Sequence, residues 1–158
     1  MTLYRPCVAI ALFNTEGRVF VGERLDTPGA WQMPQGGIDS NEPIEQAAFR
    51  ELREEIGTDK ATLIRVHPVI IRYDIPEDVR ARLNLWNGKY AGQDQTWVAM
   101  RFTGTNSDIN LTQDDHPEFS NWKWVALADT LSLIVPFKQN VYRQVINAFS
   151  DIAAISSD

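Results

Sequence analysis

The stretch that decides the fold of this 158-residue chain runs from residue 36 to residue 58 and reads GGIDSNEPIEQAAFRELREEIGT. It predicts a helix over residues 43–56. Pro43 suits the first turn, where its missing N–H does no harm, and Gly57 suits the position just beyond the end. A helix with such definite ends fixes which residues share a face.

Three glutamates, Glu51, Glu54 and Glu55, share one face of this helix. Each residue turns the side chain by about 100°, so the three carboxylates fall within an arc of about 100°. That arc borders the apolar residues expected to face the core. Arg50 stands four residues before Glu54, where it can pair with and orient that carboxylate.

The acidic residues of the chain concentrate in this segment. Between Asp39 and Glu55 lie six acids and two arginines, so the segment carries −4 of the net charge of −6. Clustered carboxylates repel one another unless a cation relieves them. The alternative interpretation is a solvated helix face, which is the usual reading of a charge run.

Carboxylate oxygens in this arrangement suit a hard divalent cation, Mg²⁺ or Mn²⁺. Magnesium keeps several waters and takes a few carboxylates together with substrate phosphates, so the pattern indicates a phosphate site. Calcium would need more ligands and an Asp/Asn/Gly loop. Zinc would need histidine or cysteine, but His67 and His116 are far apart in the sequence and Cys7 is single.

The rest of the chain predicts a mixed sheet flanked by helices, because hairpins and a helix follow the early strands irregularly. The expected elements are a hairpin of residues 7–13 and 18–24, a short strand over 30–34, a loop over 35–37, strands over 62–67, 69–73, 95–102 and 122–125, a long loop region over 76–87 and 88–93, and a closing helix over 137–150.

Length and composition predict one domain over residues 1–158. The single cysteine indicates a reducing compartment, and no secretory signal or membrane-spanning apolar run is present, so a cytoplasmic protein is expected. The net charge of −6 argues against binding of duplex nucleic acid.

One motif within the opening stretch resembles the Nudix box of the Nudix hydrolases. It consists of Gly36, Glu42, Arg50-Glu51-Leu52, Glu54-Glu55 and Gly57 at the spacing of the box. The last box position, usually aliphatic, is Thr58 here. The resemblance implies an α+β Nudix fold: an α/β/α sandwich with a central mixed sheet and the box helix on one face. It also implies cleavage of a pyrophosphate bond by water.

Stretches outside the box are similar to one branch of this family, the bacterial RNA pyrophosphohydrolases and the dinucleoside polyphosphate hydrolases closest to them. They are residues 4–6, 31–37, 92–97, 117–119, 122–125, 137–138 and 141–142. This similarity implies hydrolytic removal of pyrophosphate from the 5′-triphosphate end of RNA, or asymmetric cleavage of dinucleotides such as diadenosine tetraphosphate.

The resemblance also implies roles for single residues. Magnesium, with manganese as a substitute, would be held by carboxylates and one backbone carbonyl, would bridge the phosphate oxygens and would lower the pKa of the attacking water. The implied ligands are Glu51, Glu54, Glu55, Glu118 and the carbonyl of Gly36 or Gly37. Of these, Glu54, Glu55 and Glu118 are the implied catalytic residues, with Glu118 a ligand or the general base rather than a solvent-facing loop acid.

Four residues match positions that contact the 5′ phosphates or the first bases in this branch, namely Arg5, Arg24, Phe137 and Lys138. Tyr73 is a further candidate, because its ring could stack on a base. Arginine planes and aromatic faces can stack on bases without reading sequence, which suits a binder of RNA 5′ ends. Alternatives stay open: Phe137 as a core residue of the last helix, Tyr73 as a packing residue and Arg24 as a surface residue.

Two other functions compete with these. Sanitation of oxidised nucleoside triphosphates fits less well, because the similarity outside the box points to the other branch. A non-catalytic Nudix module would be expected to have lost box glutamates, whereas Glu42, Glu51, Glu54 and Glu55 are all present.

Overall fold

Strand β1 (Tyr4–Phe13) is the centre of the fold in a computed structural model that describes residues 3–83 and 85–156. From Cys7 to Phe13 every side chain is fully buried, because β1 is covered on both faces. It pairs in parallel with β7 (Gly92–Phe102) along its whole length. Parallel pairing of strands so distant in sequence makes this the long-range contact around which the other strands assemble.

The remaining strands extend the sheet on both sides of this pair, all with antiparallel pairing. The strands β5 (Ala61–Val66) and β6 (Ile71–Asp74) pair with β7 on one side. The other edge of β1 pairs with β4 (Gln35–Gly37) and with β2 (Arg18–Arg24), and β2 pairs in turn with β3 (Trp31–Gln32) and β8 (Phe119–Ala126). The expected hairpin and mixed sheet are confirmed.

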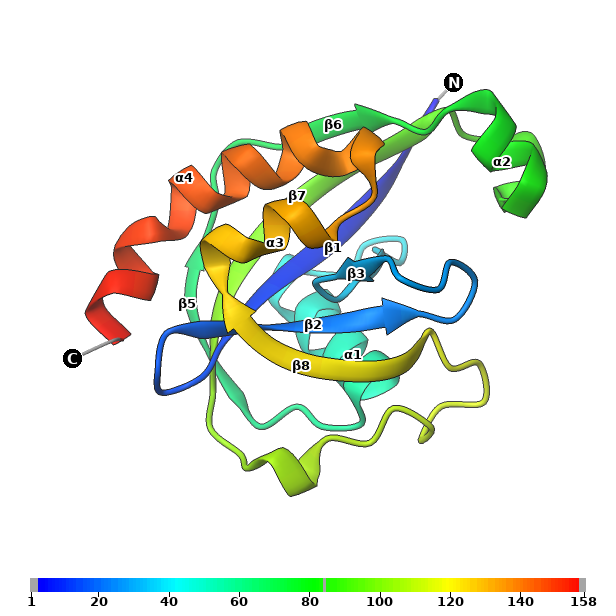
Figure 1. Cartoon of the computed structure of the whole chain (residues 1–158). Coiled ribbons are helices and arrows are strands. Elements are labelled where there is room, and N and C mark those ends of the chain that lie inside the picture. The colour runs from blue at the N-terminus through cyan, green and yellow to red at the C-terminus, as the bar shows by residue number, and fades with distance from the viewer. Residues whose placement is uncertain (1–2, 84, 157–158) are drawn as a thin grey trace.

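Helices cover both faces of the sheet (Figure 1). The box helix α1 (Ile44–Ile56) packs on one face, and α4 (Gln139–Ser156) with α3 (Thr130–Leu133) on the other. The α1 side buries Val8, Ile10, Leu12, Ala48, Leu52 and Ile56, and the α4 side buries Ala9, Ala11, Phe13, Val141, Val145 and Phe149. The α/β/α sandwich with the box helix on one face is therefore confirmed. Across the residues described, no helix is long and apolar enough to cross a membrane.

The prediction of a loop at residues 35–37 was wrong. These residues form β4, with Val8 opposite Gly36 and Cys7 opposite Gly37. Glycine has a low intrinsic preference for strands, so local sequence indicated a loop, and pairing with the buried β1 overrides that preference.

The expectation of structureless chain over 76–87 was also wrong, because α2 (Glu77–Leu83) and a 3₁₀ turn (Leu85–Gly88) lie there. None of the residues of α2 is fully buried, so the sequence lacks the apolar periodicity that would have indicated a helix. The available signal was the acidic pair Glu77 and Asp78 at its start and basic residues near its end, which suit the helix dipole. The other short turns are the 3₁₀ segments Asn106–Asp108, Leu127–Asp129 and Pro136–Lys138, the last of which leads into α4.

Packing between β2 and β8 positions the loop that carries Glu118. Phe119 is 2% exposed, and its ring lies where a side chain on Gly22 would stand. The N–H of Leu25 donates to the Glu118 carbonyl at 3.0 Å. The ring and this hydrogen bond hold Glu118 at the end of β2.

Gly22→Ala is expected to destabilise the protein, because the new Cβ would lie 2.4 Å from Phe119 Cγ. Overpacking of this kind lowers the free energy of unfolding by about 1–3 kcal/mol. Urea denaturation measures the change. Ser120→Ala, at an exposed position of β8, is the control and is expected to change stability by less than about 0.5 kcal/mol; equal stability of both variants would contradict the proposed packing.

Candidate active site

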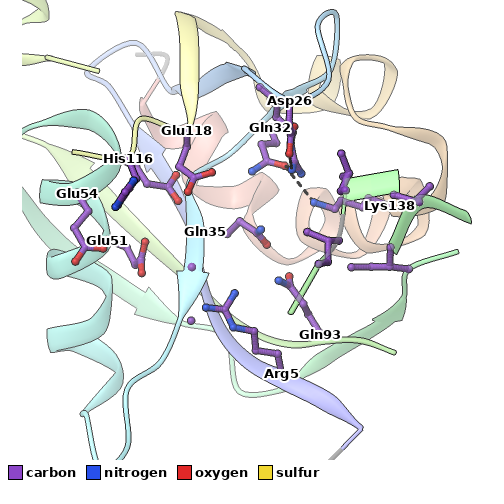
Figure 2. Close-up of a pocket in the computed structure, with 18 of the residues that line it drawn as sticks. Arg5, Asp26, Gln32, Gln35, Glu51, Glu54, Gln93, His116, Glu118 and Lys138 are labelled. Carbon is purple, nitrogen blue, oxygen red and sulfur yellow. Dashed lines mark hydrogen bonds and ion pairs between the residues drawn. The ribbon is translucent and has the colours of Figure 1, made fainter. Parts of the chain in front are cut away.

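One pocket of about 360 Å³ opens where the C-terminal part of α1, β4 and the loop before β8 face β6 and the 3₁₀ turn before α4. Its lining includes all the site residues predicted from the sequence, namely Arg5, Arg24, Gly36, Gly37, Glu51, Glu54, Glu55, Tyr73, Glu118, Phe137 and Lys138. Figure 2 shows Glu51, Glu54 and Glu118 at one side, Gln32 and Lys138 at the other, and Gln35 between them.

The three α1 glutamates differ in their surroundings. Glu51 and Glu55 are buried, with 6% and 5% exposure, whereas the Glu54 side chain is 45% exposed. Burial raises the pKa of Glu51 to about 7, with Arg50 opposing the rise. Burial, followed by the nearby Glu51 and Glu118, raises the pKa of Glu55 well above its usual value. The predicted shared stripe is thus two buried carboxylates and one at the surface.

Arg50 holds the carboxylate end of the pocket together. Its Nε and Nη2 donate to the two oxygens of Glu42, both at 2.8 Å. Its Nη1 donates to Glu51 Oε1 at 2.8 Å and to Glu54 Oε2 at 3.2 Å. Its Nη2 also donates to the Gly37 carbonyl at 2.8 Å. The predicted pairing with Glu54 is confirmed, but the shorter bonds go to Glu42 and Glu51.

Glu42 serves the loop before α1 and is not among the residues that line the pocket. One of its oxygens accepts the N–H of Asp39 at 3.0 Å, in addition to the Arg50 bonds. The hydrogen bonds from Arg50 and Asp39 lower the pKa of Glu42 to about 2. This carboxylate therefore stays charged and keeps Arg50 in place.

At Gly36 and Gly37, both in β4, other side chains already occupy the space that a Cβ would need. A Cβ on Gly36 would lie 2.1 Å from the carboxyl carbon of Glu51, and one on Gly37 would lie 2.4 Å from Arg5 Nη2. Glycine is therefore required for Glu51 and Arg5 to approach the same backbone. The Gly37 carbonyl accepts from Arg50 and Gly36 pairs with Val8 in the ladder between β1 and β4, so which of the two carbonyls serves as a metal ligand stays a prediction.

The residues at the carboxylate end of the pocket fit a divalent cation. Oε2 of Glu55 is buried and finds no hydrogen-bond partner in the described part of the chain, which is costly unless a cation satisfies it. The donors are oxygens, which Mg²⁺ and Mn²⁺ prefer. Within residues 3–83 and 85–156, no three carboxylate, imidazole or thiol groups already converge tightly enough to hold an ion. The exposed Glu54, paired with Arg50, would have to turn inward.

Glu118 points into the pocket from the loop before β8 (Figure 2). Partial desolvation at the pocket wall raises its pKa, Arg24 opposes this, and Asp26 and Asp114 add to it. An exposed carboxylate with a raised pKa can both reach a ligand and accept a proton.

The opposite side of the pocket carries two cationic side chains, the partly buried Arg24 and the buried Lys138. Arg24 forms a two-pronged ion pair with Asp26 at 2.7 and 2.5 Å. Gln32 Oε1 accepts from Arg24 Nη1 and from Lys138 Nζ, both at 3.2 Å. Burial, followed by repulsion from Arg24, lowers the pKa of Lys138 to about 7. Arg24 therefore belongs to the pocket and is not an ordinary surface residue.

Two aromatic rings stand next to these cations. Tyr73 and Phe137 stack with centroids 6.4 Å apart and 29° between the planes. Tyr73 is 7% exposed and donates its hydroxyl to Gln93 Oε1 at 2.7 Å, so it packs as well as lining the pocket. Phe137 is half-buried and packs against the same core. It therefore has a core contact and also lines the pocket, where its ring could meet a base.

The sequence prediction assigned no role to the pocket glutamines. Gln32, Gln35 and Gln93 line the pocket, and Gln95 lies beneath it with 3% exposure. The signal for two of them was present: Gln93 and Gln95 alternate with Asp94 and Thr96 along a central strand, on the face that continues to the buried Trp97.

Comparison with known proteins places the chain in a family. A profile described as the NUDIX domain matches residues 3–145. The chain is 50% identical over 153 residues to the RNA pyrophosphohydrolase of Wolbachia sp. subsp. Brugia malayi, covering 97% of this chain and 94% of the relative. It is 51% identical over 150 residues to the RNA pyrophosphohydrolase of Rhodospirillum rubrum, covering 95% and 89%.

Solved structures share the fold at low sequence identity. The E. coli dihydroneopterin triphosphate pyrophosphohydrolase superposes with a TM-score of 0.67 at 22% identity, covering 92% of this chain and 99% of that one. The C. elegans Ap4A hydrolase gives 0.60 at 17% identity, covering 92% and 98%. With the profile match over most of its length and relatives half identical to it, the chain belongs to the Nudix family of pyrophosphohydrolases.

Proposed function

We propose that this protein removes pyrophosphate from the 5′-triphosphate end of RNA by attack of water on phosphorus, leaving a 5′-monophosphate. The observation that carries the proposal is the shared pocket, in which the box carboxylates face cationic side chains and aromatic rings. The names of the half-identical relatives support the choice of RNA. The substrate would be a single-stranded 5′ end and not a duplex, and the protein would act in the cytoplasm as one Nudix domain.

Nudix hydrolases generally need a divalent metal, and we propose Mg²⁺, with Mn²⁺ able to replace it. Glu51, Glu54, Glu55, Glu118 and the carbonyl of Gly36 or Gly37 would hold it. Such an ion, when bound, neutralises charge on the phosphates and acidifies water. The orphaned Glu55 Oε2 is the main support for this assignment.

The chain's own residues would act on three parts of the substrate. Glu118 would accept a proton from the attacking water, for which its raised pKa is suitable. Arg5, Arg24 and Lys138 would neutralise phosphate oxygens. Phe137, with the edge of Tyr73, would offer a ring to the first bases without reading their sequence.

Asymmetric hydrolysis of dinucleoside polyphosphates is the second candidate. Beyond the aromatic rings the pocket has an apolar wall, which is made by Ile75, Val79, Leu83 and Leu85. These side chains offer no hydrogen-bonding group, so they would accept a second nucleoside as readily as the next nucleotide of an RNA.

Turnover assays separate these candidates. With Mg²⁺, wild-type protein is expected to release pyrophosphate from triphosphorylated RNA and to act more slowly on diadenosine tetraphosphate and on nucleoside triphosphates. Chromatography of the products, repeated with Mn²⁺, measures this. Turnover of the dinucleotide without turnover of RNA would promote the second candidate, and no turnover of any substrate would overturn the enzyme assignment.

Glu118→Gln is expected to lower kcat by about 10²- to 10⁴-fold, because it removes the proposed proton acceptor. Asp115→Asn is the matched control: it lies in the same loop, does not line the pocket and is expected to keep wild-type rates. Rates across pH 6–9 give the readout, and a Glu118→Gln enzyme with a near-normal rate profile would remove the assignment.

In the absence of divalent ions, the free energy of unfolding is expected to fall as pH rises from about 4.5 to about 7. In that window the native protein keeps protons on Glu51 and Glu55 that the unfolded chain has lost. At pH 8 a hundredfold excess of Mg²⁺ or Mn²⁺ over Kd is expected to raise Tm by about 5–10 °C.

Thermal unfolding scans, which measure this metal-induced rise in Tm, also test Glu54 as a ligand. Glu54→Gln is expected to reduce the metal-induced rise in Tm, while Glu45→Gln, on the exposed start of α1, leaves it unchanged. An undiminished rise in Glu54→Gln would contradict the proposed ligand set.

A further inference from the structure

A tryptophan beneath the pocket sets the orientation of a chain of amides. Trp97 is 1% exposed, and its Nε1 donates to Gln95 Oε1 at 2.9 Å. The indole N–H can only donate. The oxygen of the Gln95 amide must therefore face Trp97, and its nitrogen must face the other way.

The Gln95 nitrogen passes this orientation on to two neighbours. It donates to Gln35 Oε1 at 2.5 Å and to Gln93 Oε1 at 3.1 Å. Gln93 Oε1 also accepts the Tyr73 hydroxyl at 2.7 Å. Because a nitrogen that donates needs an oxygen opposite it, neither Gln35 nor Gln93 can reverse its amide without breaking the chain.

The two outer amides consequently turn their nitrogens away from Gln95. Both side chains line the pocket, and Figure 2 shows Gln35 between Glu118 and Glu51 on one side and Gln93 and Lys138 on the other. Each terminal NH₂ carries two N–H donors. The pocket therefore receives donors, not acceptors, between its carboxylate and cationic sides.

We infer that Gln35 and Gln93 form an amide subsite that donates hydrogen bonds to oxygens of the substrate's phosphate chain, with Gln95 and Trp97 as positioning residues that fix its polarity. The inference deepens the proposed function, since RNA 5′ ends and dinucleotides both carry such a chain. Neutral donors bind anionic oxygens without a positive charge that would repel a cation at the carboxylates.

The subsite is also connected to the carboxylate end. The backbone N–H of Gln35 donates to Glu55, the glutamate with the orphaned oxygen. One residue thus contacts a proposed metal ligand through its backbone and faces the phosphate path with its side chain. Gln35 would set the spacing between the cation and the phosphates.

Gln95→Glu tests the polarity directly, because a carboxylate of the same shape accepts but does not donate. At pH 8 it keeps the Trp97 bond and forces Gln35 and Gln93 to turn their oxygens toward the substrate. The expected result is an increase of about ten- to hundredfold in KM for triphosphorylated RNA, with a smaller change in kcat. Kd for a methylene-bridged, uncleavable 5′-triphosphate RNA, measured by calorimetry, is expected to rise by the same factor.

Two further variants separate polarity from packing and charge. Gln95→Met fills the same space without orienting its neighbours and is expected to raise KM and Kd by only about three- to tenfold. Gln46→Glu makes the same chemical change at an exposed position of α1 and is expected to leave both constants unchanged. Thermal scans of all three variants identify any loss of folding.

Whether Gln95→Glu raises KM and Kd more than Gln95→Met does decides the inference. Gln95→Met equal to or worse than Gln95→Glu, in protein that remains folded, would overturn it, as would KM and Kd within twofold of wild type in both. If wild-type protein cleaves the dinucleotide but not RNA, the proposed function fails, and the same variants measured with the dinucleotide still test the subsite.

Discussion

The burial of two carboxylates beside an apolar sheet is the constraint on which the rest of the structure depends. Glu51 and Glu55 lie one helical turn apart and are almost inaccessible to solvent. Burying like charges together is unfavourable unless ion pairs, hydrogen bonds or a cation offset it. The fold supplies Arg50, which bonds Glu51, and the Gln35 backbone N–H, which bonds Glu55, but it leaves one Glu55 oxygen without a partner in the described chain. That unsatisfied oxygen is the observation behind the proposed cation site.

The two sides of the pocket carry opposite charge, and different elements of the fold supply each side. α1 and the Glu118 loop concentrate negative charge, while β2 and the 3₁₀ turn before α4 bring Arg24 and Lys138 together. Asp26 and the Gln32 oxygen moderate the repulsion between these cations. A polyphosphate held by a metal on the carboxylate side and neutralised by the cations on the other would offset the repulsion among the carboxylates and the repulsion between the cations. The glutamines between them belong to neither charge system, and their orientation comes from a buried indole.

How much of this was predictable depends on the range of the interactions involved. The α1 helix, its Gly57 end and the pairing of Arg50 with Glu54 follow from local spacing, and the structure agrees. The region of α2 was not recognised, because its packing does not produce an apolar stripe in the sequence. The strand at Gln35–Gly37 was missed because its stability lies in pairing with β1, which local propensity does not report.

The sequence by itself determined the chemistry of this protein: the spacing of Glu51, Glu54 and Glu55 on one helix, the box motif around them and hence the family. Helical periodicity makes such a face readable, because residues three and four apart must be neighbours. Only the tertiary structure decided which glutamates are buried, that Arg5, Arg24 and Lys138 meet those carboxylates in one pocket, and which way the pocket amides point. These outcomes depend on contacts between strands far apart in the chain, and burial, pKa and hydrogen-bond polarity are properties of the surroundings that such contacts create.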